Sequence, residues 1–505
     1  MKKIWIIAGF IFSACVPRVD RGPVLVEQAQ RPVHVIQLPD ANNPNIYLQA
    51  TIRAGSRFDP VGFEGLASLT ANALVEAGAG RMTGEQLQQA LYPTGNSLQV
   101  QVHREFATLR LRCHRDHAQL CTELFTAVIT QPAFEEEPLE RLKDEAVYSI
   151  TDGILSDEEQ LGEEVFNGLL FEGHPYGHPV IGRGGTIPLL TAARARTFYE
   201  QHYLRSSITV GVAGHYTDAH LNALQTGLEK LSTAPGPDLA MLDPVPIKGR
   251  TLAVVATQTP VTGFHLGQLH EVDRNHKDWP ALYLATLALG AHRQSSGRLF
   301  ETIRTQRGLN YGDYSYMEAF NQRGWSTYPD QGVLHLQPMF YLWLRPTAHI
   351  NGAFTLKLAI DELETWTEKG LSAEEFESSK NYALGHLPLE AQDVGRRLAY
   401  ELEAFTHGVP NILEELPQRL ESLTLEQVNT AIRTHVQPEH LMIAAVSGEG
   451  ATLVEQLTGN QPTPIEYANV DPEPSQSQRD AVIAEKDLSL DAQATEVLET
   501  TGIFR

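Results

Sequence analysis

The chain has 505 residues, which is more than one ordinary hydrophobic core organises, so two or more domains are expected. Hydrophobic residues make up 42% of the chain and charged residues 20%, as is typical of a globular protein. The net charge is −23 and no block of Lys or Arg occurs. This charge argues against nucleic-acid binding, which needs clustered basic side chains to neutralise phosphates.

The first 15 residues have the layout of a bacterial lipoprotein signal peptide. Lys2 and Lys3 precede an apolar run that is too short to span a bilayer as a mature anchor, and small residues then lead to Cys15. This ending resembles a lipobox, whose cysteine is lipidated and becomes the mature N-terminus; the alternative is an ordinary secretory signal with a chance cysteine. Val16 favours, by the same resemblance, a cell-envelope lipoprotein on the outer membrane facing the periplasm. Residues 16–30 are predicted to be a polar tether.

Strand and helix patterns alternate in the region that follows. "HVIQLP" and "IYLQATIRAGSRFD" predict strands on either side of a turn cluster, and residues 62–78 predict a buried helix. "TGEQLQQALYPTG" predicts a second helix, with a Thr/Gly start and a Pro/Gly stop. "SLQVQVHREFATLRLRC" alternates like one or two paired strands, and amphipathic helices are expected around 114–130 and 135–152.

Three of these elements recur in the same order further along the chain. "TLRLRC" is matched by "YLWLRP", which places Arg345 233 residues after Arg112. "PLERLKDEAV" is matched by "EFESSKNYAL", and "HYLRSSITVGVAG" by "HVQPEHLMIAAVSG", at nearly the same spacing. The repeat predicts two related domains, residues 31–230 and 250–460, joined by the Pro/Gly-rich linker 231–249. Because each mixes strand pairs with long helices, the expected fold class is α+β, a mostly antiparallel sheet covered by helices.

Two further features leave alternatives open. Residues 461–505 turn polar and then regain a short apolar pattern, which predicts an extended tail with at most one short strand or helix; plain disorder is the alternative. Cys113 and Cys121 can pair outside the cytoplasm, but two buried free thiols fit equally well, because the sequence gives no distance between them.

Several motifs together carry a family resemblance. A first helix that begins "GLA", the segments "GHPYGHPVIG" and "RLFETIRTQRGLNY", and the two repeated domains resemble the pitrilysin/insulinase family of metallopeptidases. The resemblance covers about residues 33–460 and is nearest to the two-domain bacterial and mitochondrial-processing-type branch. It implies that the two homologous domains form half of a clam-shell peptidase chamber.

The family's first helix carries the zinc motif H-x-x-E-H, in which two His bind the metal and the Glu activates water. Aligned on "GLA", these positions hold Ser68, Ala71 and Asn72. Ser and Asn are poor zinc ligands, and Ala cannot move a proton. The third ligand position falls near Val147, with Glu145 close but out of register. The resemblance therefore implies a degenerate zinc motif and no metal or other cofactor bound by this chain.

One other cluster has the composition of a metal site. "CHRDH" brings together Cys113, His114 and His117, but no acid stands in a catalytic position. The favoured interpretation is a solvated helix start, with Asp116 near the positive end of the helix. An enzyme that uses unusual ligands such as His103 or His114 would need both a new site and a new water activator.

The second domain keeps the family's other signature, R-x-x-x-x-x-x-Y, as Arg304 and Tyr311. The resemblance implies that these two side chains reach across the chamber to a zinc site, bind the substrate backbone and stabilise the oxyanion. On spacing alone, an amphipathic helix over 297–307 with a surface Arg and a core Tyr is the alternative. In the strand after the second helix, Gln99 replaces an Asn that contacts substrate in the family.

These residues lead to two functional hypotheses. In the first, the chain is the non-zinc, substrate-binding subunit of a heterodimeric zinc metallopeptidase that hydrolyses peptides in the cell envelope. A partner of the same family supplies H-x-x-E-H and zinc, and an edge strand of this chain pairs with the peptide. In the second, it is a stand-alone, non-catalytic peptide-binding or scaffold lipoprotein, which would not need oxyanion donors.

Overall fold

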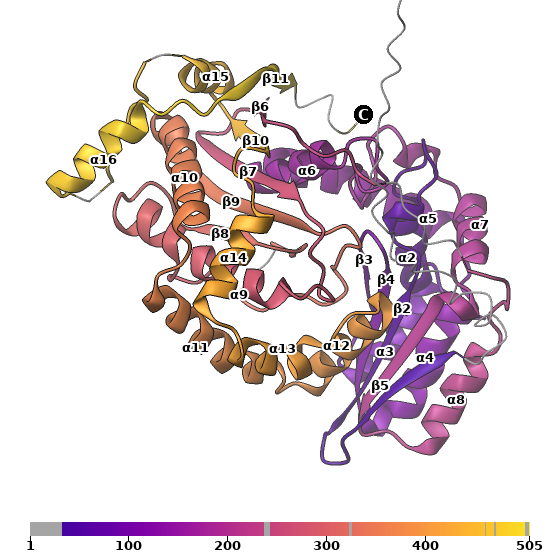
Figure 1. Ribbon diagram of the computed structural model, residues 1–505. Coiled ribbons are helices and arrows are strands. Elements are labelled where there is room, and N and C mark those ends of the chain that lie inside the picture. The colour runs from indigo at the N-terminus through magenta and orange to yellow at the C-terminus, as the bar shows by residue number, and fades with distance from the viewer. Residues whose placement is uncertain are drawn as a thin grey trace, which may run out of the picture.

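The computed structural model (Figure 1) describes residues 33–236, 243–322, 326–459, 461–468, 471–499 and 504. The predicted signal peptide, Cys15 and the polar tether lie outside these residues. Within the described part of the chain, no helix is both long enough and apolar enough to cross a membrane.

The first half of the chain builds a five-stranded sheet in the order β1-β5-β2-β4-β3. β1 pairs with β5 in parallel, and the remaining neighbours pair antiparallel. Strand β5 is buried along its whole length, as expected for a central strand. The strands are β1 (His34–Pro39), β2 (Asn45–Ile52), β3 (Gln99–Val102), β4 (Ala107–His114) and β5 (Ile208–Gly214).

The second half repeats this sheet with one strand added. Its order is β11-β6-β10-β7-β9-β8, in which β6 to β8 take the places and directions of β1 to β3 and β11 joins the outer edge of β6 in parallel. The match confirms the fold inferred from the sequence repeat: two homologous α+β halves. The strands are β6 (Arg250–Ala256), β7 (Val261–Leu269), β8 (Asp313–Tyr316), β9 (Met339–Ala348), β10 (Leu441–Ser447) and β11 (Leu490–Glu499).

Helices cover both sheets (Figure 1). In the first half they are α2 (Leu66–Glu76), α3 (Gly84–Leu91), α4 (Ala118–Thr130), α5 (Glu136–Tyr148), α6 (Glu158–Leu170), α7 (Ala192–His202) and α8 (Asp218–Leu228). In the second half they are α9 (Trp279–Gly290), α10 (His349–Lys369), α11 (Ala373–Glu390), α12 (Val394–His407), α13 (Ile412–Glu421), α14 (Leu425–His435), α15 (Gly450–Thr458) and α16 (Pro474–Ala484). Two π-helical turns, η4 (Ser149–Gly153) and η8 (Phe300–Thr305), interrupt this regular pattern.

The two halves exchange one helix each. α6, from the first half, packs against β7 and β10 of the second sheet, while α12, from the second half, packs against β5 and β1 of the first. Glycines permit both contacts: a Cβ on Gly162 of α6 would lie 2.7 Å from the His265 ring, and one on Gly211 of β5 would lie 2.7 Å from Leu398 of α12. The helices begin 236 residues apart, at Glu158 and Val394, so the exchange follows the sequence repeat.

The residues after 460 are more ordered than the extended tail that the sequence predicts. They form α16 and β11, and Ile483, Ala484 and Leu488 join the hydrophobic core of the second half. The apolar positions are few and widely spaced, so their burial depends on the surface that α10 and β6 already provide. At the far end, Phe504 is buried and its carbonyl accepts a hydrogen bond from the Gly184 backbone N–H of the first half.

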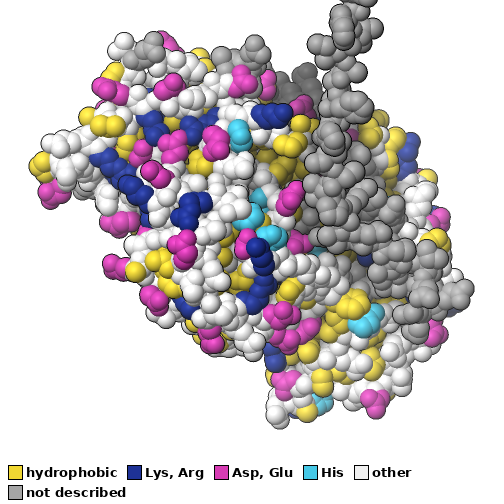
Figure 2. All heavy atoms as spheres, in the orientation of Figure 1, with side chains coloured by type: hydrophobic (Ala, Val, Ile, Leu, Met, Phe, Trp, Pro, Cys, Tyr) yellow, Lys and Arg dark blue, Asp and Glu magenta, His cyan; other side chains and the backbone are white. Residues whose placement is uncertain are grey.

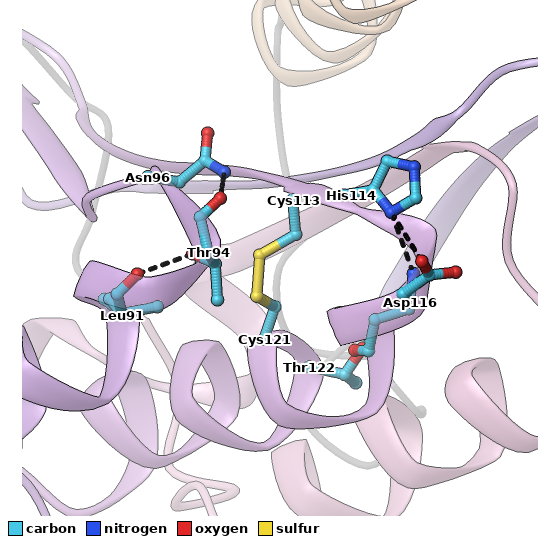
Figure 3. Close-up of a disulfide and its surroundings, with 9 residues drawn as sticks. Leu91, Thr94, Asn96, Cys113, His114, Asp116, Cys121 and Thr122 are labelled. Atoms are coloured by element: carbon cyan, nitrogen blue, oxygen red, sulfur yellow. Dashed lines mark hydrogen bonds and ion pairs between the residues drawn. A yellow bond between two sulfur atoms is a disulfide. The ribbon is translucent and has the colours of Figure 1, made fainter.

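The structure joins Cys113 and Cys121 in a disulfide, which the sequence leaves open (Figure 3). The bond connects the end of β4 to α4, its Cα atoms are 6.6 Å apart, and both residues are fully buried. A buried disulfide of this kind persists in an oxidising compartment.

Reduction of this disulfide is expected to destabilise the chain by about 2–3 kcal/mol, because a cross-link over a short loop restricts the unfolded chain. The measurement is the urea midpoint of unfolding with and without a reductant that acts on the unfolded state. The double variant Cys113→Ala/Cys121→Ala is the control and should not respond to reductant. Equal midpoints for the wild type under both conditions would contradict the prediction.

Candidate functional site

The helix at the family's zinc position, α2, begins at a buried carboxylate. Asp59 accepts hydrogen bonds from the backbone N–H groups of Gly65 (2.8 Å) and Ala67 (2.7 Å), which otherwise lack partners at a helix start. His178 Nε2 lies 3.2 Å from the same carboxylate. Burial raises the pKa of Asp59, although His178 and the two N–H groups oppose the shift. The "HPYG" segment therefore has a structural role, since its following residue, His178, anchors the start of α2.

The three positions of the zinc motif have no ligand set in the structure. Ala71 is fully buried. Asn72 turns back on its own helix, where its Nδ2 donates to the Ser68 backbone oxygen at 2.8 Å. Of the three, Ser68 alone is among the described residues that line the neighbouring cavity. These residues do not fit a zinc ion, and no catalytic step through a metal in this chain follows from them.

The third ligand position, near Val147, also holds no carboxylate. Glu145 is not among the described residues that line the cavity beside Ser68, and it pairs with Arg141 on the surface of α5 at 2.6 Å. Tyr148, the last residue of α5, and Ser149, the first residue of the π-helical turn η4, line the cavity beside Ser68 instead. Tyr148 remains largely exposed, so an aromatic ring occupies the region where the family's third ligand is expected.

A cavity of about 610 Å³ lies next to Ser68 and is lined by both halves of the chain. The first half contributes the end of β3, the η4 turn and α6; the second contributes segment 319–321, segment 333–335 and β9. Its charged lining consists of three carboxylates and one guanidinium, from Asp152, Glu163, Glu164 and Arg104. The cavity therefore has a volume in the range of ligand-binding clefts and a lining that carries more negative than positive side chains.

Two neutral histidines add hydrogen-bonding groups to the cavity. Burial, with Arg110 and Arg104 nearby, lowers the pKa of His103 to about 3. Burial also holds the pKa of His335 well below its usual value. His103 Nε2 and His335 Nδ1 have no hydrogen-bond partner within the described part of the chain. Near neutral pH these rings can accept or donate hydrogen bonds without adding positive charge.

Arg304 and Tyr311 lie together on the surface of the second half. Arg304 belongs to the π-helical turn η8, and its guanidinium carbon is 5.0 Å from the centre of the Tyr311 ring and 5.4 Å from that of Phe300. The Tyr311 side chain is 74% exposed, which rules out the core tyrosine of the alternative interpretation. Neither residue is among the described residues that line the cavity beside Ser68.

A buried network fixes the turn that presents Tyr311. Asn310 Nδ2 donates to Asp313 Oδ1 at 2.6 Å and to the Arg345 carbonyl at 3.1 Å, while the Gly312 N–H donates to Asn310 Oδ1. Asp313 is fully buried, and burial raises its pKa to about 8, so its carboxyl is mostly neutral at neutral pH. Sequence reasoning missed this network, although the "NYGD" segment around Tyr311 contains both side chains.

Strand β3 is the edge strand of the first sheet and lies between two hollows. Gln99, at its start, lines a cleft of about 780 Å³ together with residues of β2, β4 and α12. Gln101 and Val102, at its end, line the cavity beside Ser68. An unpaired strand edge of this kind can accept an extended peptide as an additional strand.

Two other candidate metal ligands, Cys113 and His114, are engaged in other contacts. Cys113 is in the disulfide, and His114 Nδ1 accepts a hydrogen bond from the Asp116 backbone N–H at 3.3 Å (Figure 3). Within the described residues, one group of side chains, His276, Asp278 and His435, has ligand atoms close enough for a metal. His435 Nε2 is 2.9 Å from Asp278 Oδ2, and His276 Nδ1 accepts the Asp278 N–H, so the cluster already links α9 to α14 by hydrogen bonds.

The visible face of the molecule also bears on binding partners. Figure 2 shows Lys and Arg interspersed with Asp and Glu over the second half, rather than gathered in a patch of one sign. This distribution agrees with the absence of a basic block in the sequence and gives no support to nucleic-acid binding on this face.

Comparison with known proteins places these features in a family. Residues 35–183 match the insulinase family (peptidase family M16), and residues 189–382 match the peptidase M16 inactive domain. A Streptomyces coelicolor protein named as an uncharacterized zinc protease is 23% identical over 372 residues, or 71% of this chain and 76% of that protein. The non-peptidase homolog YmxG of Helicobacter pylori is 22% identical over 408 residues, or 80% of this chain and 90% of that protein.

Solved structures show the same fold. A peptidase M16 inactive domain from Pseudomonas fluorescens superposes with a TM-score of 0.72 and 22% identity, covering 82% of this chain and 95% of that one. A protease from Helicobacter pylori gives a TM-score of 0.71 and 14% identity, covering 83% and 98%. With its two-domain fold and its degenerate positions Ser68, Ala71 and Asn72, the chain belongs to the peptidase M16 (insulinase) family, as an inactive-type member without the zinc motif.

Proposed function

We propose that this chain is the zinc-free, substrate-binding subunit of a two-chain metallopeptidase. One observation carries the proposal: the Arg304–Tyr311 pair is retained with Tyr311 exposed, yet it does not line the chain's own cavity, where the zinc ligands are missing. A cation and a phenol O–H are suited to stabilise the negative charge that develops when a peptide carbonyl is attacked.

In the proposed assembly, a partner of the same family would hold zinc in an H-x-x-E-H motif, which would supply Lewis-acid chemistry for peptide hydrolysis. Arg304 and Tyr311 donate hydrogen bonds to the substrate backbone and to the oxyanion of the tetrahedral intermediate. The edge of β3 pairs with the extended peptide, and Gln99 contacts it at the start of that strand. This chain therefore orients the substrate and stabilises charge, and the partner supplies the nucleophile.

We also propose a location in the cell envelope, as an outer-membrane lipoprotein facing the periplasm. The proposal is supported by the lipobox-like sequence that ends at Cys15 and by the buried Cys113–Cys121 disulfide, which fits an oxidising compartment. The lipid on Cys15 would be the membrane contact.

The test is co-expression with the product of a neighbouring gene that encodes H-x-x-E-H. We expect the two chains to co-purify, to cleave unstructured peptides together, and to lose this activity on zinc chelation, while this chain alone cleaves nothing. The control is the same complex with the partner's Glu replaced by Gln. Cleavage by this chain alone, together with one bound zinc per chain, would contradict the proposal.

A stand-alone peptide-binding protein is the second candidate, and the polar cavity beside Ser68 favours it. The two candidates differ in their need for a partner. If the genome encodes no second chain with H-x-x-E-H and the isolated chain binds extended peptides without cleaving them, the second candidate holds.

A further inference from the structure

Residues near the C-terminus contact the turn that carries Arg304 and Tyr311 and fix its position. We call the described residues 461–468 and 471–484 the C-terminal clamp. They follow residue 382, where the family match ends, so they lie outside the part of the chain that the family match covers. Their contacts converge on residues 306–308, which connect η8 to Tyr311.

A buried ion pair forms the first contact. Arg307 is fully buried, and its Nε donates to both carboxylate oxygens of Asp480, at 3.0 and 3.1 Å, while its Nη2 donates to Oδ1 at 2.5 Å. The hydroxyl of Tyr467 donates to Asp480 Oδ2 at 2.7 Å. Arg307 Nη1 also donates to the Thr302 carbonyl at 2.6 Å, so Asp480 is connected through Arg307 to η8 itself. A bidentate pair with both charges out of water sets position more strictly than an exposed pair does.

Two backbone contacts complete the clamp. Gln476 Nε2 donates to the Gln306 carbonyl at 2.9 Å. Gly308 has φ of +66°, and a Cβ there would lie 2.3 Å from the Ala468 carbonyl oxygen, so the clamp leaves no room for a side chain at this turn. Gln306 and Gly308 lie two and four residues after Arg304, so both contacts act on the backbone that follows it.

The clamp is itself fixed to a rigid element. The Glu466 N–H donates to Asn351 Oδ1 at 2.7 Å, and Asn351 Nδ2 donates to the Glu466 carbonyl at 2.9 Å. Asn351 lies in the first turn of α10, which forms part of the core of the second half. The clamp therefore connects the turn to the hydrophobic core of the second half.

The Arg304–Tyr311 pair needs such support, because Arg304 is only half-buried and Tyr311 is mostly exposed. The ring contacts that place Arg304 are with Phe300 and Tyr311, and Tyr311 is mostly in solvent. Asn310 and Asp313 fix the end of the turn beside Tyr311. The clamp fixes the end beside Arg304.

We propose that the C-terminal clamp positions Arg304 and Tyr311 for catalysis, with Asp480 as its principal positioning residue. This inference rests on the proposed function, because the pair must act on a substrate for its position to matter. Asp480 touches no substrate and acts through Arg307. Displacing a catalytic group by about 1 Å can cost a hundredfold in rate, so loosening the turn should lower kcat more than it raises KM.

The test compares Asp480→Asn with the wild type in two measurements on the full chain. In the free chain, amide hydrogen exchange over residues 300–312 should become about tenfold faster, because the turn opens more often. In the complex with the zinc-bearing partner, kcat should fall about tenfold with KM changed less than twofold. Asp480→Glu should recover part of both effects.

Val482→Ala is the matched control. Val482 lies on the same helix, α16, two residues after Asp480, but it is 71% exposed and so contributes little to the packing of the helix. It should leave exchange at 300–312 and kcat unchanged. If Asp480→Asn does not fold, Gln476→Ala replaces it, since this change removes one hydrogen bond and no buried charge.

The outcomes separate this inference from the proposed function. Faster exchange at 300–312 with a lower kcat supports both. Faster exchange in a chain for which no partner gives activity supports the clamp as a structural support and overturns the proposed function. Unchanged exchange, or unchanged kcat in an active complex whose turn has loosened, overturns the positioning role of Asp480.

Discussion

Replacing Arg304 by Ala in the assembled two-chain peptidase is expected to lower kcat by about 10²–10³-fold, the range observed when a donor to an oxyanion is removed. The guanidinium lies against the Tyr311 ring at the surface and forms no ion pair with any described residue, so its loss should not unfold the chain. Tyr311→Phe should lower kcat as well, because the ring remains while the O–H donor is lost. The measurement is steady-state peptide hydrolysis by the purified complex.

The controls for this experiment separate catalysis from assembly. Both variants should form the complex in size-exclusion chromatography and leave the partner's zinc content unchanged, since neither residue touches a metal site in this chain. Arg298→Gln serves as the matched variant: Arg298 lies six residues earlier and pairs with Glu375, so it should leave kcat within twofold of the wild type. Unchanged kcat in both Arg304→Ala and Tyr311→Phe would exclude the role proposed for the pair.

The second large effect concerns stability. Phe166→Ala in α6 is expected to lower the free energy of unfolding by about 3–5 kcal/mol, the usual cost of truncating a buried aromatic side chain. Phe166 is almost fully buried against the second sheet, with its ring centre 5.9 Å from that of Tyr341 and 6.5 Å from that of His265. The measurement is urea unfolding of the full chain.

The number of unfolding transitions of this variant is as informative as the decrease in its free energy of unfolding. Because α6 belongs to the first half and covers the second sheet, both halves should lose stability together in one transition. Tyr92→Ala is the control, since Tyr92 is 86% exposed and its loss should change stability by no more than about 0.5 kcal/mol. Two separate transitions, with the first half unaffected, would contradict the prediction.

Much of the fold follows from local sequence patterns. The helix expected over residues 62–78 is α2, and the repeat of "TLRLRC" as "YLWLRP" corresponds to β4 and β9, which occupy equivalent places in the two sheets. These patterns depend on residues close in sequence, so periodicity and repetition reveal them. The exchange of α6 and α12 leaves no such mark, because the apolar face of a helix is the same whichever sheet it covers.

The candidate site, too, could be predicted from the sequence only in part. Ser68, Ala71 and Asn72 are found by aligning one short motif, and Arg304 and Tyr311 by another. The contacts that support them join distant segments, as Asp480 and Arg307 do across 173 residues, and no local pattern encodes such a pair. The sequence allowed one short strand or helix after residue 460, whereas the structure has both α16 and β11; β11 forms because the edge of β6 offers hydrogen-bonding partners.

The helix exchange holds the two halves together independently of the covalent connection between them. Each half has one sheet face covered by a helix that the other half supplies, so separating them would expose Phe166 on one side and Leu398 on the other. The peptide bonds between β5 and β6 therefore contribute little to keeping the halves together. If a protease cleaved the chain between residues 232 and 249, the two fragments would remain associated, as two subunits of a complex do.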